Sequence, residues 1–336
     1  MGLKEFYSLR FFKINNKKMR FYLLITFFII GSYSYSQNIS DPVQKHGKLA
    51  FEGHVLKDEH GKVVRLKGMS LFWSQWQPQF YTAQSVKLLK ESWGVTVVRA
   101  AMGIENGGYL KNPEIEKAKV YRVIDAAIAN GIYVIVDWHD HHAEDHLSES
   151  RGFFEEVSRK YGSYPNIIYE IYNEPLAVSW KNVLKPYHES VIAQIRMNDP
   201  DNIIVCGTPQ WSQNVLEASQ NPIKEFNIAY TLHFYAGTHK EELRNEAKLA
   251  IEKGLPIFVT EFGTTNADGD GKVFYKETKK WLRFMKKNDL SWCNWSLADK
   301  REASAALKQG IEPDHIDSSE NLSDSGKFLL KILHKG

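Results

Sequence analysis

Two glutamates stand where two short apolar segments of the chain end. Glu174 closes the segment 166–174, NIIYEIYNE, and Glu261 lies near the end of the segment 256–263, PIFVTEFG. Two carboxyl groups on opposite sides of one bond are suited to hydrolysing a glycosidic acetal, because one group can donate a proton to the leaving oxygen. The other attacks the sugar carbon when the carboxyls are ~5–5.5 Å apart, or activates a water at ~6.5–9.5 Å. The spacing along the sequence leaves both stereochemical outcomes open.

Polar side chains that could support such a pair close other apolar segments. Arg99 is suited to a bidentate hydrogen bond that would hold Glu261 ionised. Asn173 can bind the sugar hydroxyl next to the reacting carbon. His233 and Tyr235 are two residues apart on one expected strand, so their side chains share a face. We therefore expect one site supported by residues at several strand ends, namely Arg99, His139, Asn173, His233, Tyr235 and Trp295.

Two further groups of acidic and histidine residues near these segments are not expected to be catalytic. Glu170 precedes Glu174 by four residues on the same expected strand, and a carboxylate deep in a protein core must be paired, so we expect it to bind Arg99. The segment 139–146, HDHHAEDH, resembles the start of a zinc site, since histidines are common zinc ligands. Such a site needs more ligands on later strands, where His233 is the only other candidate histidine, so we expect no catalytic metal and no cofactor.

Eight apolar segments must position these side chains, and amphipathic segments that read as helices separate most of them. Strands that are apolar throughout and alternate with helices predict a parallel sheet covered on both sides. Eight such units predict a (β/α)8 TIM barrel, in which catalytic residues lie at the C-terminal ends of the strands. A doubly wound open sheet is the rival, but no glycine-rich phosphate loop follows the first strand. The expected strands are 65–70, 95–100, 132–139, 166–174, 202–207, 228–235, 256–263 and 290–296, and the expected helices are 82–93, 113–130, 147–161, 180–198, 239–253 and 273–288.

The two ends of the chain carry other patterns. The segment 47–65 alternates apolar and polar residues around Asp58–Gly61, which predicts a short N-terminal β-hairpin, and 317–335 predicts a closing helix. Residues 1–36 have the pattern of a signal peptide, with basic residues before an apolar run, and Met19 is an alternative start. That run is far shorter than the ~20 residues that span a bilayer. We therefore expect cleavage, no stable membrane anchor, a secreted or periplasmic protein, and a single catalytic domain at 37–336.

Charge and cysteine content restrict the partners and the chemistry further. Residues 1–36 hold six Lys or Arg and one Glu, a net of +5, so the net charge of +3 falls to −2 without them. Nucleic acid is a poor partner for such a chain, because binding the phosphate backbone needs clustered positive charge. Cys206 and Cys293 each lie inside an apolar segment, so we expect buried free thiols.

The ordered motifs of the chain resemble glycoside hydrolase family 5, in its bacterial endo-β-1,4-glucanase branch. The matching stretches run from residue 47 to residue 310 and include RLKGMS, VVRAAM, VDWHDH, IIYEIYNEP, HFYAGTH, IFVTEFGT and LSWCNWSLADKREASAAL. The resemblance implies a retaining mechanism, with Glu174 as general acid/base, Glu261 as nucleophile and Trp295 as a platform under the sugar at the cleavage site. It also implies that the sugars on the glycone side contact Trp211, Lys300 and Glu302, with Trp76 stacking further out.

Departures from the family pattern concern sugar recognition. Relatives often have a histidine in the loop after the first strand, where this chain has the segment 70–73, SLFW, and a tyrosine where it has Gly103. We expect a monomeric retaining endo-β-1,4-glucanase that acts on cellulose or related β-glucans, a polysaccharide partner rather than a protein one. The alternatives on the same barrel are a mannanase or xyloglucanase and a carbohydrate-binding barrel without catalysis.

Overall fold

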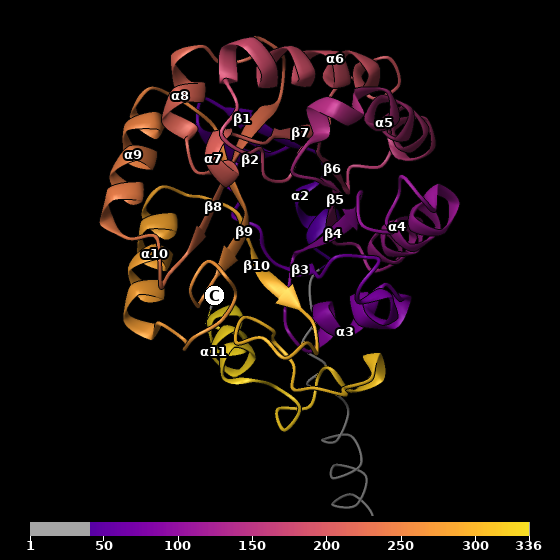
Figure 1. The fold of residues 1–336 in the computed structure, drawn as a ribbon, viewed down its shortest axis with the longest axis vertical. Coiled ribbons are helices and arrows are strands. Elements are labelled where there is room, and N and C mark those ends of the chain that lie inside the picture. Colours follow the sequence, from indigo (N-terminus) through magenta and orange to yellow (C-terminus); the bar gives the residue numbers. More distant parts are fainter. Residues whose placement is uncertain (1–40, 336) are drawn as a thin grey trace, which may run out of the picture. The chain divides into compact units, whose positions relative to one another are not determined.

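Eight parallel strands close into a barrel in the computed structural model, which describes residues 41–335 (Figure 1). Each strand pairs with the next along the chain, and the last pairs with the first. The predicted (β/α)8 barrel is therefore confirmed. The strands are β3 (Lys67–Leu71), β4 (Val97–Gly103), β5 (Tyr133–His139), β6 (Ile167–Glu170), β7 (Ile203–Cys206), β8 (Ile228–Tyr235), β9 (Ile257–Gly263) and β10 (Trp292–Leu297).

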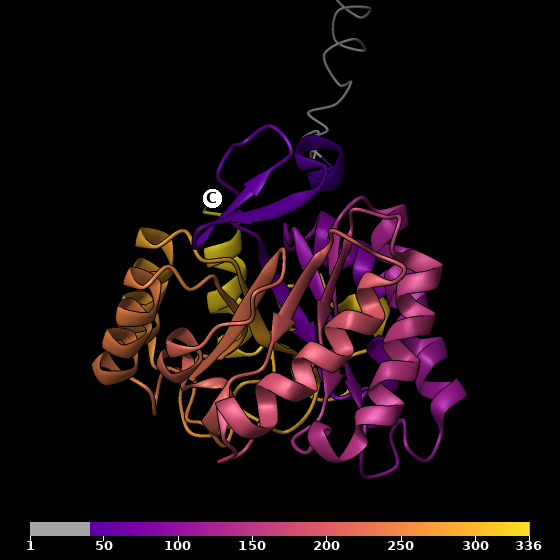
Figure 2. The same cartoon turned by 90° about the horizontal axis from the view of Figure 1, so that it is seen from above.

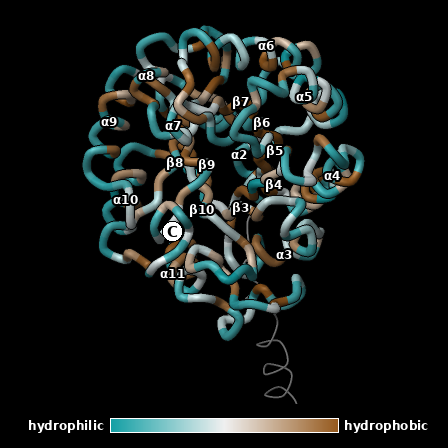
Figure 3. Tube along the Cα trace, in the orientation of Figure 1, coloured by the Kyte–Doolittle hydropathy of each residue, from teal (hydrophilic) through white to brown (hydrophobic). Residues whose placement is uncertain are grey.

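Helices surround the barrel and turn their apolar faces towards it (Figures 1 and 3). In α10, for example, Thr278, Trp281 and Met285 are buried, which is the three-to-four-residue spacing of one helix face. The helices are α3 (Ala83–Glu91), α4 (Pro113–Ala129), α5 (Leu147–Tyr161), α6 (Lys185–Arg196), α8 (Val215–Gln220), α9 (Glu241–Glu252), α10 (Tyr275–Lys287) and α11 (Asp324–Leu333), with the short α2 (Pro42–His46) and α7 (Pro209–Ser212).

The sequence missed one crossover helix and started another too early. No helix was predicted between the fifth and sixth strands, where the structure has α8, a six-residue helix that is too short for a clear periodic pattern. The closing helix α11 begins at Asp324 rather than near 317, because the Ser323 side chain accepts a hydrogen bond from the backbone N–H of Gly326 and caps the helix there.

A β-hairpin closes the N-terminal end of the barrel (Figure 2). It consists of β1 (Leu49–Glu52) and β2 (Val55–Asp58), so the two strands join at Gly53–His54 and not at the predicted turn, Asp58–Gly61. The predicted turn exists but follows β2, where the Asp58 carboxylate accepts hydrogen bonds from the backbone N–H groups of His60 and Lys62. Both turns contain glycine with positive φ, and the alternating pattern runs through both, which explains the error.

The barrel interior changes character along its axis. At the hairpin end it is apolar: Leu49 and Leu56 of the hairpin pack against inward-facing Tyr133, Ile135 and Ile168. At the opposite end the interior holds buried charged and polar side chains, which include Arg99, Asp137, Glu170, Thr260 and Glu261. Because the hairpin closes one end, the C-terminal ends of the strands form the open end of the barrel, and the polar residues predicted for the site lie there.

Three expectations concern residues outside this polar layer. Cys206 and Cys293 are free and buried, Cys206 on the helix side of the barrel wall and Cys293 on its inner side, which confirms the predicted thiols. No helix within residues 41–335 is long and apolar enough to cross a membrane. The signal peptide predicted at 1–36 lies outside the described residues.

Candidate active site

The two glutamates of interest face one another at the C-terminal end of the barrel. Glu261 lies on β9 and Glu174 follows β6, with His233 of β8 close to both. One carboxylate oxygen of Glu174, one of Glu261 and one ring nitrogen of His233 all lie within 4.8 Å of one another. An approach of two carboxylate oxygens to within this limit fits the ~5–5.5 Å carboxyl separation that accompanies a covalent glycosyl intermediate better than the ~6.5–9.5 Å that leaves room for an attacking water.

Glu261 is buried, and both of its carboxylate oxygens accept hydrogen bonds. The Tyr235 hydroxyl donates to Oε1 at 2.7 Å, and Nη1 of Arg99 donates to Oε2 at 3.2 Å. We expected Arg99 to hold this carboxylate ionised. Burial instead raises the pKa of Glu261 above its usual value, the charge of Glu174 adds to the rise, and His233, Arg99 and Tyr235 oppose it. The expectation was therefore incomplete, because it left out the desolvation of a carboxylate inside the barrel.

Arg99 binds several other groups in the same layer. Its Nε donates to Glu170 at 2.6 Å, and its Nη2 lies 2.9 Å from Asp137 and 2.8 Å from Asn173 Oδ1. Burial alone would raise the pKa of Glu170, but the contacts with Arg99 and His233 outweigh this effect and lower the pKa below its usual value. The predicted pairing of Glu170 with Arg99 is confirmed. Because Arg99 occupies the Oδ1 atom of Asn173, the amide nitrogen is the part of Asn173 that is left to donate to a ligand.

His233 lies between the acid/base candidate and the interior of the barrel. Its Nδ1 is 2.9 Å from Glu174 Oε1, and its Nε2 is 2.9 Å from Thr260 Oγ1 and 3.7 Å from Glu170 Oε1. Burial lowers the pKa of His233, but the contacts with Glu170 and Glu174 and the charge of Glu261 outweigh it and raise the pKa to about 9. At neutral pH this imidazole is therefore a cation beside Glu174.

His139 is held in a different state. Its Nδ1 is 2.6 Å from Asp137 Oδ2, and its ring stacks on Trp295 at 5.1 Å between centroids with the planes 3° apart. Trp73 packs edge-on against it at 4.1 Å. Burial, with the positive charge of Arg99, lowers the pKa of His139 well below its usual value, so the ring is neutral. The stack places His139 and Trp295 together, as the sequence predicted for two ends of the same site.

One side of the mouth is aromatic and charged. Trp76 is 49% exposed and packs against Trp73. The Lys300 ammonium lies 4.9 Å from the centre of the Phe72 ring and pairs with Glu302 at 2.6 Å. Phe72 also contacts Trp76. Three residues expected to bind substrate, Trp76, Lys300 and Glu302, are thus joined through contacts with one another or with Phe72.

Trp211 lies elsewhere in the mouth. It is 47% exposed and lines a cavity of about 380 Å³ together with Glu174, Gln213, His233 and His239, and the residues that line this cavity do not include Lys300 or Glu302. The segment 210–212 has positive φ at three consecutive non-glycine residues, and the Trp211 N–H donates to the carbonyl of Pro175 at 2.7 Å. The sequence grouped Trp211 with Lys300 and Glu302, whereas the structure places it beside the acid/base candidate.

The histidines at the end of β5 and in the segment after it do not converge on one point. His139 faces Trp295, His141 Nδ1 lies 3.1 Å from the carbonyl oxygen of Glu174, and His146 pairs with Asp140 at 2.7 Å. A smaller group, Glu105, Asp140 and His142, has possible ligand atoms within 4.8 Å of one another. The two members of the H-x-H sequence thus have different partners, which is not the arrangement of a shared metal ligand pair.

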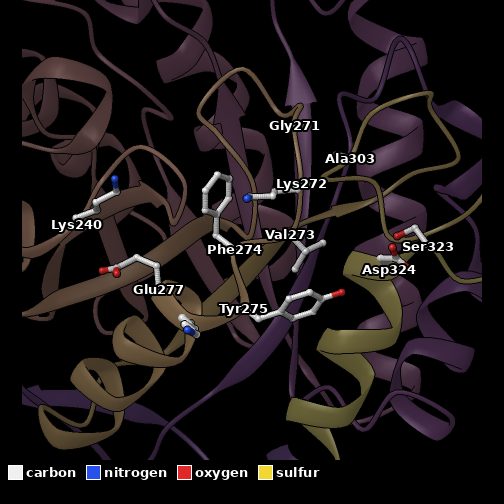
Figure 4. A pocket seen from close by; sticks show the side chains of 11 residues that line it. Lys240, Gly271, Lys272, Val273, Phe274, Tyr275, Glu277, Ala303, Ser323 and Asp324 are labelled. Atoms are coloured by element: carbon white, nitrogen blue, oxygen red, sulfur yellow. The ribbon is translucent and has the colours of Figure 1, made fainter.

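A large cavity elsewhere on the barrel is not the site of this chemistry. A cavity of about 810 Å³ lies between the start of α10, the start of α11 and the loop before α10, with Lys272, Tyr275 and Asp324 on its walls (Figure 4). Neither glutamate of the pair lines it. This cavity is larger than the one of about 380 Å³ beside Glu174, so the converging charged residues locate the site better than cavity volume does.

Sequence reasoning missed several residues of this mouth. Thr260, Trp73, His141 and His239 contact residues described above, and Gln213 lines the same cavity as Trp211. Thr260 and Trp73 had an available signal, since one directly precedes Glu261 and the other follows a predicted strand end. Gln213 and His239 lie in loops whose paths no periodicity predicts.

Comparisons with known proteins agree with this geometry. Residues 57–301 match the family model described as cellulase, glycosyl hydrolase family 5. The chain is 51% identical to endoglucanase Z of Dickeya dadantii over 87% of this chain and 66% of that protein, and 42% identical to an endoglucanase of Clostridium saccharobutylicum over 96% and 73%. A variant of the catalytic domain of a Thermobifida fusca endoglucanase, solved in complex with cellotetraose, matches with a TM-score of 0.83 at 33% identity, covering 88% of this chain and all of that one.

These likenesses confirm the resemblance seen in the motifs. The chain spans just under two thirds of the length of endoglucanase Z, so the likeness concerns the barrel and not that whole protein. The family match covers Arg99, Glu174 and Glu261. The chain belongs to glycosyl hydrolase family 5, the cellulase family.

Proposed function

We propose that this protein is a retaining endo-β-1,4-glucanase that hydrolyses internal bonds of cellulose or related β-glucans. One observation carries the proposal: oxygens of Glu174 and Glu261 lie within 4.8 Å of one another across the open end of the barrel. That distance suits direct attack by one carboxylate while the other protonates the leaving group. The endoglucanase relatives and the structure that holds cellotetraose support β-1,4-glucan as the substrate class.

The reaction has two steps. In the first, a Glu261 oxygen forms a bond to the anomeric carbon while the glycosidic bond breaks, and Glu174 gives its proton to the departing oxygen. In the second, Glu174 accepts a proton from a water, the water oxygen bonds to the same carbon, and Glu261 is released as a carboxylate. Two displacements at one carbon retain its configuration.

The neighbours of the pair favour this division of roles. Glu261 is fixed through both oxygens by Arg99 and Tyr235, so it is held in place as a nucleophile. Glu174 is less buried, with 16% of its side chain exposed, and one of its oxygens lies beside the His233 cation. It can therefore exchange protons with a leaving group and then with water.

The arrangement of side chains around the two glutamates also suggests which residues contact the substrate. Asn173 Nδ2 is proposed to donate to the sugar hydroxyl next to the reacting carbon, and Trp295, stacked on His139, to form the floor under that sugar. Lys300, Glu302 and Trp76 are proposed to bind the glycone part of the chain. Trp211 lies beside Glu174, which protonates the leaving oxygen, so we assign Trp211 to the leaving-group side and not to the glycone side.

The remaining parts of the proposal concern the whole protein. We propose that residues 1–36 are a cleaved signal peptide, that residues 37–336 form one catalytic domain, and that the enzyme acts outside the cytoplasm as a monomer. Mass spectrometry of the secreted protein would locate its first residue, and light scattering would give its oligomeric state. An intact N-terminus or a stable dimer would overturn the corresponding part.

The substrate is tested by initial rates on three soluble polysaccharides. Carboxymethylcellulose should be hydrolysed with a fast loss of viscosity, because internal cuts shorten chains early. Glucomannan and xyloglucan serve as the competing substrates. A rate on either of these that far exceeds the rate on every unbranched β-glucan would replace the proposed activity with that of a mannanase or a xyloglucanase.

The two glutamates are tested by changing the leaving group. Glu174→Gln should lower kcat/KM on cellotetraose by about 10²–10⁴-fold, the usual contribution of general acid catalysis. It should leave kcat/KM almost unchanged on a dinitrophenyl cellobioside, whose leaving group needs no proton. Glu261→Gln should abolish turnover of both substrates.

A matched control is Glu156→Gln, which alters a carboxylate that pairs with Lys117 on the outside of the barrel. It should retain wild-type rates on both substrates. Turnover of cellotetraose by both glutamine variants at the wild-type rate would refute catalysis by this pair and leave a binding protein as the better interpretation.

A further inference from the structure

Thr260 links the acid/base half of the site to its buried interior. The residue directly precedes Glu261 on β9 and is fully buried. Its Oγ1 lies 2.9 Å from His233 Nε2 and 2.6 Å from Glu170 Oε1, and it also contacts the Thr231 hydroxyl. No other hydroxyl among the described residues hydrogen-bonds to His233.

The protons of this cluster can be assigned by counting. A threonine hydroxyl has one proton to donate and can accept two hydrogen bonds. Glu170 is paired with Arg99, which favours its ionised form, and an ionised carboxylate only accepts, so the Thr260 proton goes to Glu170. Thr260 must then accept from His233, which places a proton on Nε2. The second acceptor position serves the Thr231 hydroxyl.

The opposite nitrogen of His233 faces the acid/base. Nδ1 lies 2.9 Å from Glu174 Oε1, and because the pKa of His233 is raised to about 9, both nitrogens carry protons at neutral pH and Nδ1–H donates to Oε1. Glu174 Oε2 lies 3.9 Å from His141 Nδ1, beyond hydrogen-bond distance. The charged and titratable groups that influence His233 or are influenced by it are Glu170, Glu174, Glu261, Asp137 and His139.

We propose that Thr260 is a positioning residue for general acid catalysis. Its hydroxyl accepts from Nε2–H and so stabilises the doubly protonated ring of His233, whose Nδ1–H donates to Glu174 Oε1; the catalytic proton then resides on Oε2, the oxygen left for the leaving group. The inference rests on the proposed function and adds to it a residue that touches neither substrate nor reacting atom. Without the hydroxyl, Nε2–H keeps only the more distant Glu170 Oε1, at 3.7 Å, and the cationic form of His233 loses its nearest partner on that side.

The test measures Thr260→Val on cellotetraose and dinitrophenyl cellobioside, the two substrates that distinguish the role of the general acid from that of the nucleophile. We expect kcat/KM on cellotetraose to fall by roughly tenfold or more, part of the ~10²–10⁴-fold that general acid–base catalysis contributes. On dinitrophenyl cellobioside kcat/KM should change little, because that leaving group needs no acid. The basic limb of the pH profile on cellotetraose, where the acid/base loses its catalytic proton, should move to higher pH, because a weakened His233 cation stabilises the Glu174 anion less.

Two further variants separate the hydroxyl from simple damage. Thr260→Ser keeps the hydroxyl and should restore both the rate and the basic limb. Thr264→Val removes another buried threonine hydroxyl just after the same strand, one that bonds Ser325, and should leave the pH profile as in wild type. The proposal would be overturned if Thr260→Val lost equal activity on both substrates or left the basic limb unmoved. It would also be overturned if Thr264→Val shifted the basic limb as Thr260→Val does.

Two further results do not depend on the rates of Thr260→Val. If Thr260→Val does not fold, ¹⁵N shifts of His233 in the wild-type protein test the same claim: an imidazolium at neutral pH is expected, and a neutral ring would overturn it. The proposed function fails separately, through an active Glu174→Gln enzyme on cellotetraose, whatever the result for Thr260.

Discussion

Replacing Tyr235 with phenylalanine should move the acidic limb of the pH profile. The Tyr235 hydroxyl donates to Glu261 Oε1 at 2.7 Å and so favours the ionised nucleophile. Burial, with the charges of Glu261 and Glu174, raises the pKa of Tyr235 well above its usual value, so the donor keeps its proton throughout the working range. Removing it takes away one of the groups that oppose the burial-driven rise in the pKa of Glu261.

The size of the shift follows from the contact that is lost. A hydrogen bond to a charged group contributes about 1.5–3 kcal/mol, and one pKa unit corresponds to about 1.4 kcal/mol. The pKa of Glu261 should therefore rise by about one to two units in Tyr235→Phe. Because the nucleophile must be ionised, activity at acidic pH should fall by about tenfold for each unit of that rise. The sign is fixed: loss of a donor disfavours the anion, so the limb moves to higher pH.

The assay is kcat/KM on cellotetraose as a function of pH, which reports the groups of the free enzyme. Tyr169→Phe is a matched control, because Tyr169 is also a buried tyrosine that donates to a carboxylate, that of Asp199, away from the mouth. Its acidic limb should stay where the wild-type limb is, even if the protein becomes less stable. An unmoved limb in Tyr235→Phe, or a limb at lower pH, would refute the reasoning about Glu261.

Three other expectations test different parts of the site. Arg99→Lys should lower the free energy of unfolding by about 3 kcal/mol or more and remove most activity. The reason is that one ammonium cannot replace the guanidinium that binds Glu170, Asn173 and Glu261. An unchanged denaturant midpoint would contradict this. Trp211→Ala should raise KM for long cello-oligosaccharides by about two- to tenfold, the value of ~0.5–1.5 kcal/mol of aromatic contact, with little change on dinitrophenyl cellobioside, and the opposite pattern would return Trp211 to the glycone side. Excess chelator should leave the rate on carboxymethylcellulose unchanged, and a loss that added metal reverses would show a metal requirement.

Much of the barrel could be predicted because its signals are local. Each strand is a short apolar run that ends in polar residues, as in the segment that ends at Glu174, and parallel strands place such ends together. The partnership of Arg99 with Glu170 followed from the cost of burying an unpaired charge, which holds in any barrel. These inferences needed only the order of residues and the period of a strand.

Other features depend on geometry that the residue order does not contain. Trp211 owes its place to the segment 210–212, in which three non-glycine residues adopt positive φ, a conformation that favours glycine and that no sequence pattern signalled here. The raised pKa of Glu261 results from burial among several charges and not from a single partner. The role of Thr260 became visible only when two donors and one carboxylate were found around its hydroxyl.

The central claim is that Glu174 and Glu261 catalyse a double displacement, and the configuration of the first product tests it most directly. Proton NMR should follow the anomeric signals during the first minutes of cellopentaose hydrolysis, before mutarotation. The account predicts that the new reducing end appears as the β-anomer and only later equilibrates. An α-anomer as the first product would mean that water attacks directly, and it would contradict the mechanism derived from the approach of the two carboxylates to within 4.8 Å.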